Sequence, residues 1–202
     1  MQQFGLKANF HAVSDILTKG NALQLEANQH DIIHVFDDGG FRELVLLKMF
    51  NLKTNVGRHG DDAIDAYGKL YELKTVNLVN TKGEFRTNPG ITTCHHMNHI
   101  IIDRYRHVEG FLIGIFCYHI PARIYLVRPQ DLEVFFKKWE NQLITKGQEH
   151  INNPKIKYQH VLEFGELLYH DKQFDNIVEP RPKPKSSKKT IKVSENQLSL
   201  FD

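Results

Sequence analysis

Residues 62–74 of the chain read DAIDAYGKLYELK. Their alternation of apolar and polar residues predicts two short strands, and the turn at Gly68 joins them into a β-hairpin. Side chains two positions apart on a strand point to the same face of the sheet. Glu72 and Lys74 are therefore expected to project together, while Leu73 between them points into the core.

Asp62 lies on the first strand of this hairpin and can join Glu72 if the strands pair as expected. Two carboxylates and the Leu73 carbonyl form a set of hard oxygen ligands that suits Mg²⁺. Lys74 beside such an ion can orient a water molecule or stabilise charge on a phosphate, which is typical of phosphodiester hydrolysis. The alternative is a solvated strand that carries an ion pair. Asp65, three residues beyond Asp62, is expected to face the opposite side at the end of the hairpin.

Helical and strand patterns surround the hairpin on both sides. The segments with helical spacing are residues 5–29, with an interruption at Gly20 and Asn21, then 41–50, 98–107 and a helix opened by Pro129. Strands are predicted at residues 111–118 and 123–127, a long loop at 81–93, and a polar loop with a final strand or helix at 151–169. This order predicts an α/β fold in which helices flank a central mixed sheet.

Length and composition describe an ordinary globular chain of 202 residues with a formal net charge of +2. The length suits one domain with a tail. No apolar run approaches the length of a membrane span, and the first residues do not resemble a signal peptide. Two cysteines, Cys94 and Cys117, cannot form a disulfide framework, so a reducing, cytoplasmic location without membrane contact is expected.

The charge is unevenly distributed along the chain. Residues 180–202 hold six bases and two acids, a net charge of +4, whereas residues 1–179 hold 20 bases and 22 acids, a net charge of −2. The alternating Pro and Lys residues after Pro180 predict an extended or disordered tail. A near-neutral body does not exclude DNA as a partner, because some of its acids are expected to hold a metal ion whose charge the sum omits.

Two clusters of polar residues allow more than one interpretation. Residues 94–99 read CHHMNH, which fits a transition-metal site, imidazole donors to guanine in a DNA major groove, or a polar helix start. Asn152 and Asn153 precede Pro154, which fits either a turn or amide readout of adenine. Residue types and spacing leave these alternatives open.

Eight motifs follow one another between about Phe36 and about Gly165. They are GRHGDDAID (57–65), YELK (71–74), TKG (81–83), HHMN (95–98), YR (105–106), RPQDLE (128–133), KWE (138–140) and INNPK (151–155). In this order they resemble the PvuII family of type II restriction endonucleases. An ordered series of motifs is far more specific than any one of them.

The resemblance implies the PD-(D/E)xK nuclease fold and Mg²⁺-dependent cleavage of double-stranded DNA by a homodimer. A two-fold dimer reads a palindrome, by analogy CAGCTG, and blunt ends are the implied product. It also implies a bacterial host with a cognate DNA methyltransferase. The implied organisation is an N-terminal helical dimerisation segment (1–35), a catalytic and DNA-recognition domain (36–179) and a flexible basic tail (180–202).

Site residues follow from the resemblance position by position. The implied catalytic residues are Asp62, Glu72, Lys74 and Tyr105, and the implied metal ligands are Asp62, Glu72 and the Leu73 carbonyl. The implied DNA-contacting residues are Asp38, His95, His96, Asn152 and Asn153.

Three features depart from the family pattern. The loop between Thr81 and His95 is several residues longer, Cys94 replaces a third histidine, and His59 stands where the family has a glutamate. Because none of them touches the catalytic set, they put the target sequence in doubt rather than the activity.

The last six residues, QLSLFD, look like the peptide by which bacterial proteins dock on the replication sliding clamp. The residues that would dock are Gln197, Leu198, Leu200 and Phe201. The alternatives are a tip that packs on its own body or a chance match. The peptide makes a clamp-tethered repair or processing nuclease the alternative function. A catalytically silent DNA-binding module is the non-enzymatic alternative, and the intact catalytic set argues against it.

Overall fold

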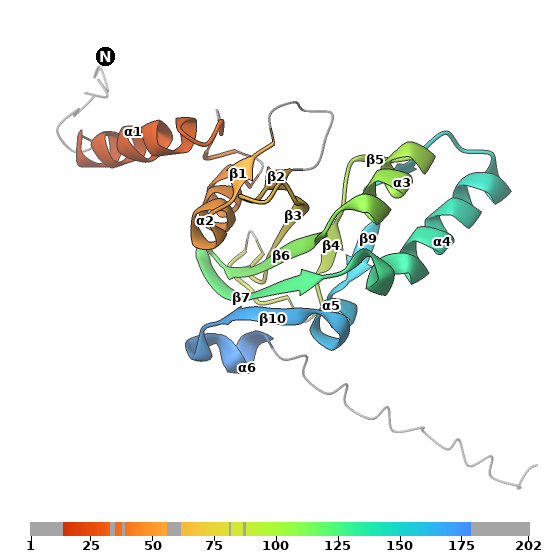
Figure 1. Cartoon of the computed structure of the whole chain (residues 1–202). Coiled ribbons are helices and arrows are strands. Elements are labelled where there is room, and N and C mark those ends of the chain that lie inside the picture. Colours follow the sequence, from red (N-terminus) through yellow and green to blue (C-terminus); the bar gives the residue numbers. More distant parts are fainter. Residues whose placement is uncertain are drawn as a thin grey trace, which may run out of the picture.

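The computed structural model describes residues 14–32, 35–37, 39–55, 62–80, 82–86 and 88–178. Its elements, in chain order, are α1 (Ser14–Asn28), α2 (Gly40–Phe50), β1 (Lys53–Thr54), β2 (Ala63–Ile64), β3 (Leu70–Asn77), β4 (Gly90–Thr92), β5 (His96–Met97), α3 (His99–His107), β6 (Gly110–Cys117), β7 (Ile120–Val127), α4 (Pro129–Lys146), β8 (Ile151–Asn152), β9 (Lys155–Lys157), α5 (Tyr158–Phe164), β10 (Glu166–His170), the 3₁₀ helix η2 (Lys172–Phe174) and α6 (Asp175–Val178) (Figure 1). Asp38, residues 56–61 and residues 179–202 lie outside the described part of the chain.

The centre of the fold is a mixed sheet with the strand order β1-β2-β3-β6-β7-β10. Strands β3 and β6 run parallel, with Tyr71 opposite Gly110 and Lys74 opposite Ile113, and the other neighbouring strands are antiparallel. A parallel pair needs a crossover connection, and α3 lies in the one between β3 and β6.

Helices cover both faces of this sheet. On one face α2 packs over Leu73 and Leu112. On the other face α3 and α4, which lie side by side in Figure 1, pack over Phe111 and Ile113. Because successive residues of a strand alternate between faces, Leu73 belongs to the α2 side and Glu72 and Lys74 do not.

Helix α4 forms for the reasons that its sequence suggests. Pro129 occupies the start, where its missing N–H costs nothing, and Gly147 ends the helix with φ 58°. One apolar stripe of the helix is buried; its members are Leu132, Phe135, Phe136, Trp139 and Leu143. Arg106 of α3 fastens the pair of helices, because its guanidinium donates to Glu133 and Glu140 over distances of 2.6–3.1 Å.

Two short ribbons join residues 90–97 to residues 151–157. Strand β4 pairs with β9 and strand β5 pairs with β8, both antiparallel, with His96 opposite Asn152. Between the ribbons Asn153 has φ 47°, a left-handed conformation that Asn tolerates better than most residues. The ribbons therefore bring the two polar clusters of the sequence together.

The structure confirms the predicted α/β architecture and corrects some of its elements. Helix α1 runs unbroken through Gly20 and Asn21, because a single Gly costs a helix only about 1 kcal/mol. Strand β4 lies inside the predicted loop 81–93. Asp62 lies at a bend just before β2 rather than within the strand. None of the described helices is long and apolar enough to pass through a membrane.

Candidate active site

The hairpin predicted from the sequence places the first carboxylate. Strands β2 and β3 pair antiparallel with Ala63 opposite Tyr71, so Asp62 lies beside the middle of β3. Its Oδ2 accepts a hydrogen bond from the Leu73 N–H at 2.9 Å. This bond fixes the Asp62 carboxylate against the strand that carries Glu72.

The Lys74 ammonium is the point at which the predicted site residues meet. Its Nζ lies 3.2 Å from Asp62 Oδ2, 2.7 Å from Glu72 Oε1 and 2.8 Å from the Leu73 carbonyl oxygen. The structure therefore brings together all four residues that the sequence predicts for this part of the site.

Glu72 is nearly removed from water, with 3% of its surface exposed. Burial raises the pKa of its carboxyl above the ordinary value, and the positive charge of Lys74 opposes this rise. Within the described residues, the buried Oε2 atom of Glu72 has no hydrogen-bond partner. A buried carboxylate oxygen without a donor is costly, so this atom favours a cation or a donor beside it.

Lys74 stays positively charged in this environment. Burial alone would lower its pKa, but the carboxylates of Asp62 and Glu72 outweigh burial and raise the pKa above its ordinary value. Only 13% of its side chain is exposed. The ammonium therefore acts as a charged hydrogen-bond donor at neutral pH rather than as a base.

The donor set fits a hard divalent cation. Asp62, Glu72 and the Leu73 carbonyl each contribute one oxygen to the surroundings of the Lys74 ammonium. These oxygens therefore already bind one positively charged group. No three Asp, Glu, His or Cys side chains of the described segments gather into a metal-binding group. A metal here would thus take one or two carboxylates, a carbonyl and groups from outside the protein, as Mg²⁺ usually does.

Tyr105 of α3 is fully buried. Its hydroxyl donates to the Thr93 carbonyl at 3.1 Å, and burial together with the charge of Glu72 raises its pKa. Tyr105 therefore keeps its proton and serves as a donor. Thr93 is a residue that sequence reasoning missed, because it lies in the predicted loop and no residue pattern marks it.

Four of the five predicted DNA-contacting residues form a second group at the two ribbons, whereas Asp38 lies outside the described residues. His95 Nδ1 lies 3.1 Å from Asn153 Oδ1, and His96 Nδ1 lies 3.0 Å from Asn152 Oδ1. An amide oxygen only accepts, so each imidazole donates its Nδ1–H. The ring of His150 packs edge-on against His96, with 4.6 Å between the ring centres. The histidines are thus paired with amides and do not gather into a metal site with other described residues.

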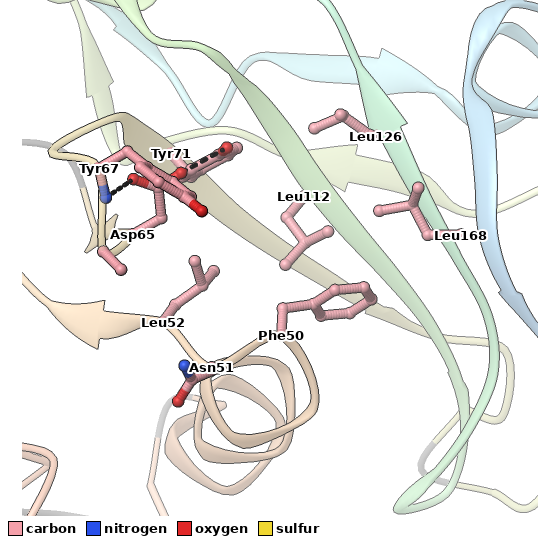
Figure 2. Close-up of a pocket in the computed structure, with 10 residues that line it drawn as sticks. Phe50, Asn51, Leu52, Asp65, Tyr67, Tyr71, Leu112, Leu126 and Leu168 are labelled. Carbon is pink, nitrogen blue, oxygen red and sulfur yellow. Dashed lines mark hydrogen bonds between the residues drawn. The ribbon is translucent and has the colours of Figure 1, made fainter.

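Figure 2 shows the residues that line a cavity of about 290 Å³. Among them Tyr71 and Leu112 belong to the α2 side of the sheet, which is opposite to Glu72 and Lys74. Phe50 and Leu52 at the end of α2 and Leu112 of β6 line it. Asp65 stands at its edge, where it accepts from Tyr67 N and from the Tyr71 hydroxyl. Asp65 therefore closes the hairpin turn, as the sequence predicts, and does not join Asp62.

The sequence model of the family described as "Restriction endonuclease PvuII" matches residues 8–169. This range contains the hairpin, the ribbons and every predicted site residue outside the C-terminal peptide. It spans most of the chain, and the mixed sheet flanked by helices agrees with it. The chain therefore belongs to the PvuII restriction endonuclease family: it has the restriction-endonuclease fold and is a type II restriction endonuclease, a hydrolase of phosphodiester bonds in DNA.

Proposed function

We propose that the protein is a Mg²⁺-dependent endonuclease that cuts both strands of a palindromic DNA site as a homodimer. The observation that carries this proposal is the Lys74 ammonium, which lies within 3.2 Å of oxygens from Asp62, Glu72 and Leu73. Type II restriction endonucleases generally use divalent metal ions, and this set of oxygens has the composition that Mg²⁺ prefers.

The chemistry divides between the metal ligands and Lys74. Asp62, Glu72 and the Leu73 carbonyl would hold the ion, which when bound would supply positive charge that stabilises the phosphate during hydrolysis. Lys74 keeps its proton, so it can donate to a phosphate oxygen or orient the attacking water. Donation to the phosphate requires Lys74 to give up part of its present contact with the carboxylates. Tyr105 keeps its proton and directs it to the Thr93 carbonyl, so it stays a neutral group whose pKa is raised by burial and by the charge of Glu72.

Base reading is assigned to the two His–Asn pairs. Because Nδ1 of His95 and of His96 faces an amide oxygen, Nε2 of each imidazole remains for a base or a phosphate. The NH₂ groups of Asn152 and Asn153 are likewise directed away from the imidazoles and suit adenine N7. The same bonds hold the amides in one orientation, which a bidentate contact to a base needs.

The proposed dimer contact, DNA target sequence and cleavage product are those that the family resemblance implies. The N-terminal segment 1–35 would supply the dimer contact, and Asp38 would approach the DNA near the two-fold axis. The proposed target is CAGCTG, cut to blunt ends, with the longer loop 81–95 as the feature most able to change it. A cutter of this kind in a bacterial cytoplasm needs a cognate DNA methyltransferase to protect the host's own sites.

The C-terminal QLSLFD favours one second candidate function, a repair or processing nuclease tethered to the sliding clamp. Apolar Leu200 and Phe201 at the tip of a Lys- and Pro-rich segment are unfavourable in water without a partner. Clamp docking through Gln197, Leu198, Leu200 and Phe201 is compatible with either activity and does not by itself choose between them.

Digestion of a sequenced plasmid tests the proposal. With Mg²⁺ the protein should give discrete fragments whose mapped ends share one palindrome and are blunt, and EDTA should stop the reaction. The variant Asp62→Asn is the matched control for a contaminating nuclease, since it should not cut. A continuous smear would favour the processing nuclease instead, and no cutting with Mg²⁺ or Mn²⁺ would refute the endonuclease proposal.

A further inference from the structure

Within the described segments, the polar or charged residues that are buried are Glu72 and Thr93, with 3% and 4% of their surfaces exposed. Tyr105 links them. Its hydroxyl donates its one proton to the Thr93 carbonyl at 3.1 Å, and the negative charge of Glu72 contributes to the raised pKa of the same hydroxyl. The two buried polar groups therefore belong to one connected cluster rather than to two separate sites.

On its other side Thr93 holds the turn that carries the DNA-reading amides. Its backbone N–H and its Oγ1 hydroxyl both donate to the Pro154 carbonyl, each over 3.0 Å. A carbonyl oxygen has two lone pairs, so Thr93 uses the whole accepting capacity of Pro154. Pro154 is buried and directly follows Asn152 and Asn153.

A backbone hydrogen bond also joins the turn at Asn153 to the segment that contains His95. The Asn153 N–H donates to the His95 carbonyl at 2.9 Å, next to the bonds that Thr93 makes with Pro154. Asn153 also has the left-handed φ of 47°, which leaves little freedom for a local adjustment. A shift of the turn when Asn153 meets a base is therefore transmitted to Pro154 and to Thr93.

We propose that Thr93 is a positioning residue that couples base reading at Asn152 and Asn153 to the orientation of Glu72 through Tyr105. This inference rests on the proposed function, because it assigns base reading to the turn and metal binding to Glu72. Its consequence is that a matched base pair places Glu72 correctly and a mismatched one does not. Cleavage is then more selective than binding.

Substitution of Thr93 tests the coupling. Thr93→Val keeps the shape but removes the Oγ1 donor, and Thr93→Ser keeps the donor. Thr92→Val is the matched control, because Thr92 is the exposed neighbouring threonine at the end of β4. Binding is measured without divalent metal, and single-turnover cleavage with Mg²⁺, on the mapped site and on the same site with one base pair changed.

Loss of one buried hydrogen bond predicts about tenfold slower cleavage by Thr93→Val. We expect its affinity to change less than threefold (RT ln 3 is about 0.65 kcal/mol) and its discrimination between the two sites in cleavage to fall. Thr93→Ser should restore both the rate and the discrimination.

A double-mutant cycle separates coupling from a simple packing defect. If Thr93 carries the signal, Asn153→Ala should slow cleavage much less in the Thr93→Val background than in the wild type, whereas independent effects would multiply. Should Thr93→Val fail to fold, Tyr105→Phe removes the next bond of the route and should give the same non-additivity. The coupling is wrong if the wild type cuts and Thr93→Val matches Thr92→Val in rate and discrimination, or if the cycle is additive. Failure of the wild type itself to cut would overturn the proposed function.

Discussion

Glu72 Oε1 lies 2.7 Å from Lys74 Nζ, in an ion pair of which the carboxylate is 3% exposed. Glu72 and Lys74 are two residues apart on β3, so their side chains lie on the same face of the strand, where both are largely shielded from water. Because removal of one partner leaves an uncompensated charge in the protein, each residue controls the charge state of the other.

Lys74→Ala should abolish detectable cleavage while specific DNA binding persists. The substitution removes the donor that stabilises charge on the phosphate, for which a loss of about 10³-fold in rate is typical. Cleavage is measured in single turnover and binding by fluorescence anisotropy without divalent metal. Lys69→Ala is the matched control, since Lys69 is an exposed lysine of the same hairpin and pairs with Glu109. Retained turnover in Lys74→Ala would remove Lys74 from the catalytic set.

The same variant should make stability depend on pH. Without Lys74, burial and Asp62 raise the pKa of Glu72 further above 4.5, whereas the unfolded chain keeps the ordinary value. A raised folded pKa gives stability that is present below the unfolded pKa and is lost as pH rises through the folded pKa. Relative to the wild type, Lys74→Ala should therefore be destabilised more at pH 8 than at pH 5, by up to about 3 kcal/mol.

Urea unfolding at the two pH values, without divalent metal, measures this difference. In the wild type Lys74 has a raised pKa, so its contribution should be lost only above pH 10.5. The double variant Glu72→Gln/Lys74→Ala lacks the titrating pair and should show no extra loss between pH 5 and pH 8. An equal destabilisation of Lys74→Ala at both values would contradict the assigned charge states.

Mg²⁺ should stabilise the wild type and not Asp62→Asn. A ligand at 100 times its Kd raises the free energy of unfolding by about 2.7 kcal/mol, and loss of one carboxylate ligand removes most of this gain. Thermal melts with and without Mg²⁺ measure the effect. Asp65→Asn is the control, because Asp65 bonds Tyr67 and Tyr71 at the hairpin turn and should leave the Mg²⁺ response unchanged.

His96→Ala and Asn152→Ala should each weaken binding to the preferred site by about 10- to 100-fold, the range expected for a lost base contact. Since His96 and Asn152 are hydrogen-bonded at 3.0 Å, the double variant should lose less than the two single losses combined. Competition binding against non-specific DNA measures the losses. The control is His107→Ala, an exposed histidine bonded to the Asp103 carbonyl within α3. Simple additivity would mean that the pair does not act as a unit.

Replacement of both Leu200 and Phe201 by Ala should prevent capture of a bacterial sliding clamp by the protein. The reason is that these side chains supply the apolar contact of the peptide, and DNA cleavage should be unaffected. Pull-down with purified clamp measures the interaction. The control variant changes Ile191 and Val193, the apolar residues of the same tail that lie outside the peptide. If the variant with both Leu200 and Phe201 replaced still captured the clamp, the C-terminal peptide would not be the clamp-binding motif.

Local patterns in the sequence predict well the hairpin that carries the proposed catalytic residues. The alternation of Glu72, Leu73 and Lys74 depends on a period of two along one strand, and a tight turn at Gly68 brings the neighbouring strand back. Asp62 follows from the same short-range geometry, although it lies at a bend rather than in β2. Contacts within about ten residues can be read from residue order because few chain conformations satisfy them.

Contacts between segments that are far apart in the sequence cannot be predicted from such local patterns. The bonds of His95 to Asn153 and of His96 to Asn152 join residues that are more than fifty positions apart, and only the short ribbons create them. Thr93 is missed for the same reason, because its significance depends on Pro154 and Tyr105 rather than on its neighbours. Gly20 shows the opposite limit, since α1 runs unbroken through it although glycine is a poor helix former, and the helix packs through Leu23 and Ala27 against the core on the α2 side.

The pairing of the strands also predicts which property is lost first on heating, sequence selection or DNA cleavage. Residues 71–77 of β3 are paired along their whole length with β6 at the centre of the six-stranded sheet, so their amides should exchange with solvent only on global unfolding. The ribbons β4–β9 and β5–β8 are two-stranded and short, and such units open locally at much lower free energy. Near its melting temperature the enzyme should therefore lose its choice of sequence before it loses its ability to cut.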